Sequence, residues 1–142
     1  MTEEANLARH QAITVQAWSG MLAVLLAMLI ADVVRLSMEG NFDDLVAPLN
    51  ADPGPTGLWV LICLICLNTL VQVAVRTVDA PVFRRAVFWL TVAYTGFFVI
   101  HQVVHLLSGE GFSIHTILDL THHTLGVWAC WAAYQWAWKA PR

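Results

Sequence analysis

The chain has 142 residues, of which 58% are hydrophobic and only 12% are charged. An ordinary soluble domain carries about twice that charged share, so the composition excludes this class and favours an integral membrane protein. The formal net charge of −3 gives no argument for a polyanionic partner, so no nucleic-acid partner is expected.

Four apolar runs follow one another along the chain, and each is long enough to cross a bilayer as a helix. They cover about residues 12–36, 57–75, 86–107 and 114–138. Segments rich in proline, glycine and acidic residues separate them. Because backbone groups inside lipid must be satisfied within their own segment, the sequence predicts an all-α integral membrane protein. We expect a bundle of four transmembrane helices that forms one domain over residues 1–142.

The basic residues predict the orientation of this bundle. Six of the seven lie before the first run, between the second and third, or after the fourth, and only Arg35 lies at the other end. Cytoplasmic segments of membrane proteins carry this excess of positive charge. We therefore expect a multi-pass protein of the inner (plasma) membrane with both termini cytoplasmic. Its expected partners are the lipid bilayer and either other membrane subunits or further copies of the chain.

Histidines are concentrated at the predicted outer ends of the third and fourth runs, since five of the six lie between positions 101 and 123. These five are His101, His105, His115, His122 and His123. Helical periodicity places positions 101 and 105 on one face, and 115, 119 and 122 on one face of the next helix. The short connection makes the two helices antiparallel neighbours. Position 105 should then lie level with about 117, and 101 with about 121, so both faces share one layer.

The rest of the fourth run predicts that its histidine face points into the bundle. The same face continues with small residues, namely Gly126, Ala129, Cys130, Ala133 and Ala137. The opposite face carries Trp128, Trp131 and Trp138. Small residues mark close helix packing in membranes, whereas large aromatic side chains suit the lipid side.

Other polar residues lie within the predicted spans. Asp32 lies near the outer end of the first run, and an aspartate there is costly unless it is paired or functional. It is expected either to pair with Arg35 or to join the histidines as a ligand or an orienting partner. Asn68 and Gln72 in the second run and Tyr94 in the third are expected to form hydrogen bonds between helices.

A transition metal is the leading explanation of the histidine cluster. Imidazoles at positions i and i+4 of a helix can bind one ion, and His101 and His105 have this spacing. The candidate ligands are His101, His105, His115, Asp119, His122, His123 and Asp32. Nitrogen and carboxylate donors without thiolate suit Zn, Fe or Cu. Such a site predicts a small oxidoreductase or a metal-dependent hydrolase, with Asp119, Asp32 or Glu110 as the general base.

Two other interpretations fit the same pattern. In a b-type haem electron-transfer subunit, His101 and His122 would be the axial ligands, with Gly96 and Gly126 leaving room for the macrocycle. Without a cofactor, the histidines would form a pH-sensing or proton-relay network, or the interface of a non-catalytic accessory or assembly subunit. An optical spectrum separates the first interpretation from a non-haem metal site, because haem gives a Soret band.

Overall fold

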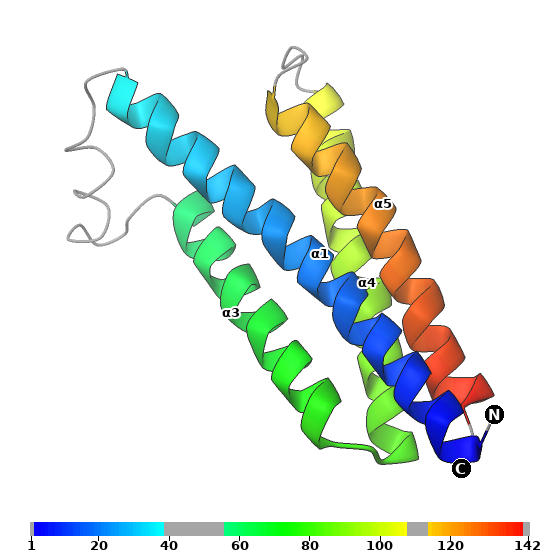
Figure 1. Cartoon of the computed structure of the whole chain (residues 1–142). Helices are drawn as coiled ribbons and strands as arrows, with labels where there is room; N and C mark the ends of the chain where they lie inside the picture. Colours follow the sequence, from blue (N-terminus) through cyan, green and yellow to red (C-terminus); the bar gives the residue numbers. More distant parts are fainter. Residues whose placement is uncertain (1, 39–55, 108–113, 141–142) are drawn as a thin grey trace.

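The computed structural model describes residues 2–38, 56–107 and 114–140, and the secondary structure within these ranges is helical throughout. It comprises α1 (Glu3–Met38), α3 (Thr56–Thr77), α4 (Pro81–Leu107) and α5 (Ile114–Tyr134), which continues as a short π-helix, η1 (Gln135–Lys139) (Figure 1). The predicted all-α fold is therefore confirmed for the described part of the chain.

Two helices begin earlier than the apolar runs predicted, for identifiable local reasons. Thr2 Oγ1 accepts a long hydrogen bond, 3.4 Å, from the Ala5 N–H, and Glu3 and Glu4 stand in the first turn of α1. Carboxylates are favourable at the positive end of the helix dipole, so α1 extends well before residue 12. Helix α4 begins at Pro81 rather than at residue 86. Proline suits the first helical position because the N–H that it lacks would have no partner in the helix, and because its fixed φ is helical.

Of the described helices, three are long and apolar enough to cross a membrane, over Glu3–Val34, Val60–Thr77 and Pro81–Val104. Helix α5 does not reach this standard, so the prediction of four apolar spans is confirmed only in part. The reason lies in its composition, since Asp119, His122, His123 and three threonines fall within Ile114–Tyr134. These are the residues on which the predicted functional site depends.

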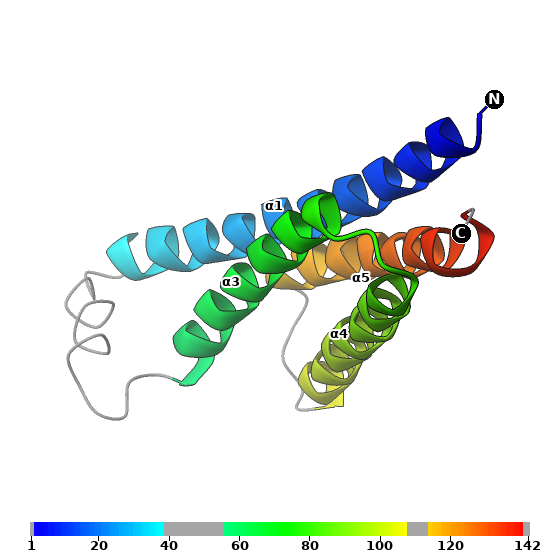
Figure 2. The ribbon, with the colours of Figure 1, turned by 90° about the horizontal axis from the view of Figure 1, so that it is seen from below.

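Helix α5 packs against both α1 and α4, and α3 packs along α1 (Figure 1). Helices α3 and α4 meet near their connection at residues 78–80 and diverge from there (Figure 2). The two ends of the chain and this connection lie at the same end of the bundle (Figure 1). The bundle is therefore closed at the end that carries the termini and splayed at the end that carries the histidines.

The face of α5 that points into the bundle is the predicted one. Its buried small residues are Gly126, Ala129, Ala133 and Ala137. On the opposite face, Trp131 is 53% exposed and Trp138 is 41% exposed. Close packing by small residues is thus confirmed, and Trp131 and Trp138 face outward as predicted, whereas Trp128 is half-buried and packs against the core. His122 lies on the buried side.

Candidate functional site around His122

The candidate site is built around the imidazole of His122 on α5. This side chain is 1% exposed, and its ring centroid lies 4.0 Å from that of Phe98 and 5.6 Å from that of Tyr94, both on α4. Neither ring nitrogen has a hydrogen-bond partner among the described residues. Leaving a buried donor or acceptor unmatched costs about 1–3 kcal/mol. Packing alone therefore does not account for a histidine here, and His122 is the strongest candidate ligand of the described side chains.

His123 has one ring nitrogen engaged and the other unpartnered. Its Nδ1 is hydrogen-bonded to the backbone carbonyl oxygen of Asp119, one turn earlier on α5. A carbonyl can only accept, so Nδ1 carries the proton and Nε2 keeps its lone pair. That Nε2 is buried without a partner in the described part of the chain. Histidines that bind metals are commonly oriented in this way, by a hydrogen bond from the nitrogen that does not bind the ion.

The register between α4 and α5 follows from their direct contacts. Phe98 faces His122, and Thr95 faces Gly126, so contacting positions on the two antiparallel helices sum to about 220. Position 101 is then level with about 119 and position 105 with about 115. The sequence predicted partners near 121 and 117, which is correct within two residues. The backbone of the outer half of α4 thus brings its histidine positions to the level of those on α5.

Helices α4 and α5 approach each other closely at Gly126, directly inward of His122. A Cβ added at Gly126 would lie 2.8 Å from both Cγ2 and Oγ1 of Thr95. Only glycine allows this separation, and Cys130 Sγ also lies 3.6 Å from Thr95 Oγ1. Gly126 is therefore used for helix packing, whereas a Cβ added at Gly96 would meet no atom within 4 Å. Of the two glycines expected to make room for a haem, only Gly96 faces open space.

Two further candidate ligands lie on the outer turns of these helices. His101 is exposed on α4, and its ring stacks near that of Phe97, with centroids 6.2 Å apart. Asp119 is half-buried on α5, one turn outward of His122 and His123. Among the described side chains, no group of three or more histidines, cysteines, aspartates or glutamates is gathered closely enough to hold a metal ion.

Asp32 lies further outward than His122, near the level of the first turn of α5. A Cβ added at Gly20 on α1 would lie 3.2 Å from Leu125 on α5, which fixes the register of these antiparallel helices. At 1.5 Å per residue, Asp32 is about 18 Å beyond Gly20, level with the start of α5. The last turns of α1 also point away from α5 (Figures 1 and 2). The structure thus brings Asp32 to the outer end of the bundle but not to the level of His122.

Three of the predicted site residues lie, wholly or in their side chains, outside the described part of the chain. Glu110 and the side chains of His105 and His115 lie outside the described residues, as does the side chain of Arg35. The backbone positions of 105 and 115 belong to α4 and α5 and share one level in the register given above.

Polar side chains connect α1 and α3 in the interior. Ser19 Oγ on α1 lies 2.7 Å from Gln72 Oε1 on α3, and Gln72 Nε2 donates to Asn68 Oδ1 at 2.7 Å. The predicted hydrogen bond between helices is confirmed for Gln72. Asn68 Nδ2 is buried without a partner among the described residues.

Tyr94 links this polar group to His122. Its hydroxyl lies close to Asn68 without a well-formed hydrogen bond, and its ring centroid lies 5.2 Å from that of the fully buried Trp18. Neither Trp18 nor Phe98 was among the residues singled out from the sequence. Phe98 could have been found from the predicted register, which placed position 98 near the level of position 122. Nothing in the sequence pattern marked Trp18.

No protein-family model matches this chain, and no characterised protein or solved structure is significantly similar to it.

Proposed function

We propose that the chain is a multi-pass protein of the inner membrane in which all four helices cross the bilayer and both termini are cytoplasmic. Three helices have the length and hydropathy for this on their own. Helix α5 is the fourth span because it packs against α1 and α4, which buries His122 and half-buries Asp119 and His123. The bundle end that carries the termini also carries Arg9, Arg76, Arg85 and Lys139, as a cytoplasmic face requires.

Within this frame we propose a transition-metal site at the histidine-rich, outer end of α4 and α5. The observation that carries the proposal is His122, a fully buried imidazole with neither nitrogen partnered among the described residues. A bound cation would satisfy one nitrogen and remove much of the cost of burying the ring. The oriented Nε2 of His123 is a second donor of the right chemistry.

The remaining ligands are proposed from the outer turns at the same end. His101 and His105 belong to α4, and His115 and Asp119 belong to α5, with backbone levels one to two turns outward of His122. Asp32 also lies near this end and would be a ligand, or an orienting partner of a histidine, at the outer edge of the site. Imidazole and carboxylate donors suit Zn, Fe or Cu. A redox-active metal would make the protein a small oxidoreductase, whereas zinc would favour hydrolysis, with Asp119 or Glu110 accepting a proton from the attacking water.

Elemental analysis of protein purified in detergent tests this proposal. We expect stoichiometric zinc, iron or copper in the natural chain and its loss in His122→Leu. The matched control is His10→Leu, because His10 lies at the opposite end of the bundle with Nδ1 bonded to the Asn6 carbonyl oxygen. Full metal retention in a folded His122→Leu variant would exclude a metal site in which His122 is a ligand. A Soret band in the optical spectrum would instead establish the haem alternative.

A further inference from the structure

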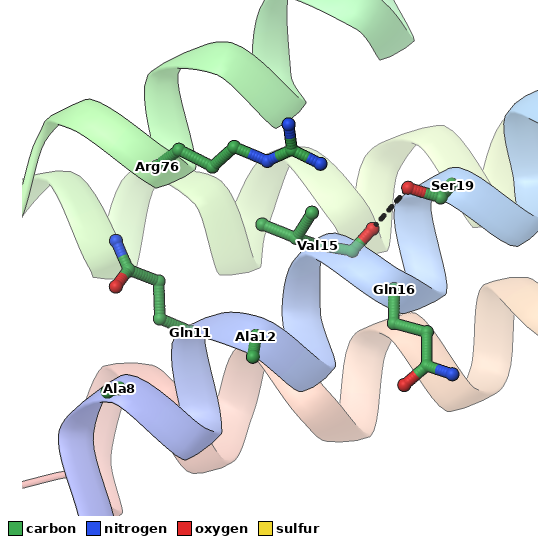
Figure 3. Close-up of a pocket in the computed structure, with 7 residues that line it drawn as sticks. All are labelled: Ala8, Gln11, Ala12, Val15, Gln16, Ser19 and Arg76. Carbon is green, nitrogen blue, oxygen red and sulfur yellow. Dashed lines mark hydrogen bonds between the residues drawn. The ribbon is translucent and has the colours of Figure 1, made fainter. Parts of the chain in front are cut away.

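A hollow of about 490 Å³ lies between α1 and α3, at the end of the bundle opposite His122. Its α1 wall includes the small residues Ala8 and Ala12, with Gln11, Gln16 and Ser19 beside them, and its α3 wall is Arg76 (Figure 3). The Arg76 side chain extends from α3, and its guanidinium lies above Val15 in this view (Figure 3). A single guanidinium thus lines the hollow, together with small side chains of α1.

The charge of Arg76 is uncompensated among the described residues, and no carboxylate lines the hollow. Arg84 gives the contrast, because its guanidinium lies 2.7 Å from a carboxylate oxygen of Asp79. The amide of Gln11 donates to the Val75 carbonyl oxygen and so is already used to join α1 to α3. Among the described residues, the hollow therefore presents one cation, the Arg76 guanidinium, whose charge favours an anion.

The depth of the hollow matches that of lipid headgroups in the proposed orientation. The apolar runs begin at about residue 12 and end at about residue 75, so Ala12 and Arg76 mark the boundary of the hydrocarbon on both helices. Outward of the hollow, the same face of α1 continues with Leu26 and Ile30, which are 42% and 62% exposed, and α3 offers Val73, 54% exposed. Acyl chains can lie along these apolar surfaces while a phosphate reaches Arg76.

We infer that this hollow binds the headgroup of an anionic phospholipid of the cytoplasmic leaflet, with the Arg76 guanidinium on its phosphate. Basic pockets between helices on the cytoplasmic side are suited to such lipids, and arginine can bind phosphate through two parallel hydrogen bonds. A free phosphate would use the guanidinium but not the apolar surfaces above it. The inference rests on the proposed membrane orientation and is independent of the metal site.

Native mass spectrometry of protein released from mixed phosphatidylglycerol and phosphatidylcholine nanodiscs tests the inference. One basic residue near a membrane surface favours anionic lipid by about fivefold, and we expect a preference of that size in retained lipid. The preference should disappear in Arg76→Gln and survive in Arg76→Lys. Arg85→Gln is the matched control, because Arg85 is an exposed arginine at the same end that does not line the hollow.

An equal loss of preference in Arg76→Gln and Arg85→Gln would overturn the inference, since it would show only general attraction to a basic surface. Displacement of the lipid by millimolar glycerol phosphate would also overturn it, because the apolar contacts would then contribute nothing. Metal content measured in the same samples keeps the two proposals apart. If the natural chain binds metal but shows no preference for anionic lipid, only this inference is rejected. If it prefers anionic lipid but contains no metal, only the metal site is rejected.

Discussion

Replacing His122 by leucine should change the stability of the protein in opposite directions with and without metal. In metal-free protein the substitution removes two unpartnered ring nitrogens from a site that is 1% exposed. Each unmatched buried group costs about 1–3 kcal/mol, while the lost ring contacts with Phe98 and Tyr94 cost about 0.5–1.5 kcal/mol. Leucine has nearly the volume of histidine, so little cavity is created. We expect the variant to be more stable than the natural chain by about 1 kcal/mol, near the lower end of the balance of these terms.

With metal present the order should reverse. A ligand at 100 times its Kd stabilises the folded state by about 2.7 kcal/mol, and the variant loses this term. Subtracting the gain of about 1 kcal/mol leaves the variant about 1.7 kcal/mol less stable than the loaded natural chain. Equilibrium unfolding in mixed micelles, with chelator and with added zinc, iron or copper, measures both differences.

The control for this experiment is Trp136→Phe. Trp136 is also fully buried with an unpartnered indole N–H in the described part of the chain, but it lies in η1 at the opposite end of the bundle. Its substitution should leave the response to metal unchanged, whatever it does to the stability itself. A His122→Leu variant that gains the same metal-dependent stability as the natural chain would refute the reasoning.

Two further substitutions test the packing of the bundle, one beside the site and one at the opposite end. Gly126→Ala should destabilise the bundle by about 1–3 kcal/mol in the same unfolding assay, because its Cβ would lie 2.8 Å from Thr95 side-chain atoms. The double variant with Thr95→Ala should recover part of this loss. The control Gly96→Ala should be neutral or stabilising, because its Cβ would meet nothing within 4 Å. Equal effects at both glycines would contradict the packing argument. Asp79→Asn should cost about 1 kcal/mol, because it leaves the buried Arg84 guanidinium without its charged partner while Asp79 itself is 43% exposed. The loss should shrink in the Arg84→Met background, and an undiminished loss there would show that the ion pair is not its cause.

The arrangement of α4 and α5 could be predicted from the sequence because few variables decide it. The short connection fixes an antiparallel pair, and helical periodicity then fixes which positions share a face and a level. The small residues on one side of α5 and the tryptophans on the other fixed its rotation. The observed contact of Phe98 with His122 differs from the predicted register by two residues.

The contribution of Asp32 could not be predicted in the same way. Its height along α1 follows from the sequence, but its distance from α5 depends on the angle at which two long helices cross. That angle is set by contacts near the middle of α1, such as Gly20 against Leu125, and its effect grows toward the helix end. The divergence of α3 from α4 has the same origin. Helix α3 packs on α1 and α4 packs on α5, and the two have few contacts with each other.

The composition of α5 links the proposed metal to the stability of the outer end of the bundle. Toward residue 134, buried alanines pack α5 against its neighbours, whereas at its start α1 turns away and polar residues replace alanine. A cation bound there would satisfy the imidazole nitrogens and the carboxylate that make the start of α5 polar. Chelation should therefore speed amide hydrogen exchange over residues 116–123 and leave residues 129–134 protected, as exchange measured by mass spectrometry in nanodiscs would report. Ligand binding must stabilise the helical turns that supply the ligands. Equal exchange in both segments after chelation would therefore show that metal does not stabilise the start of α5.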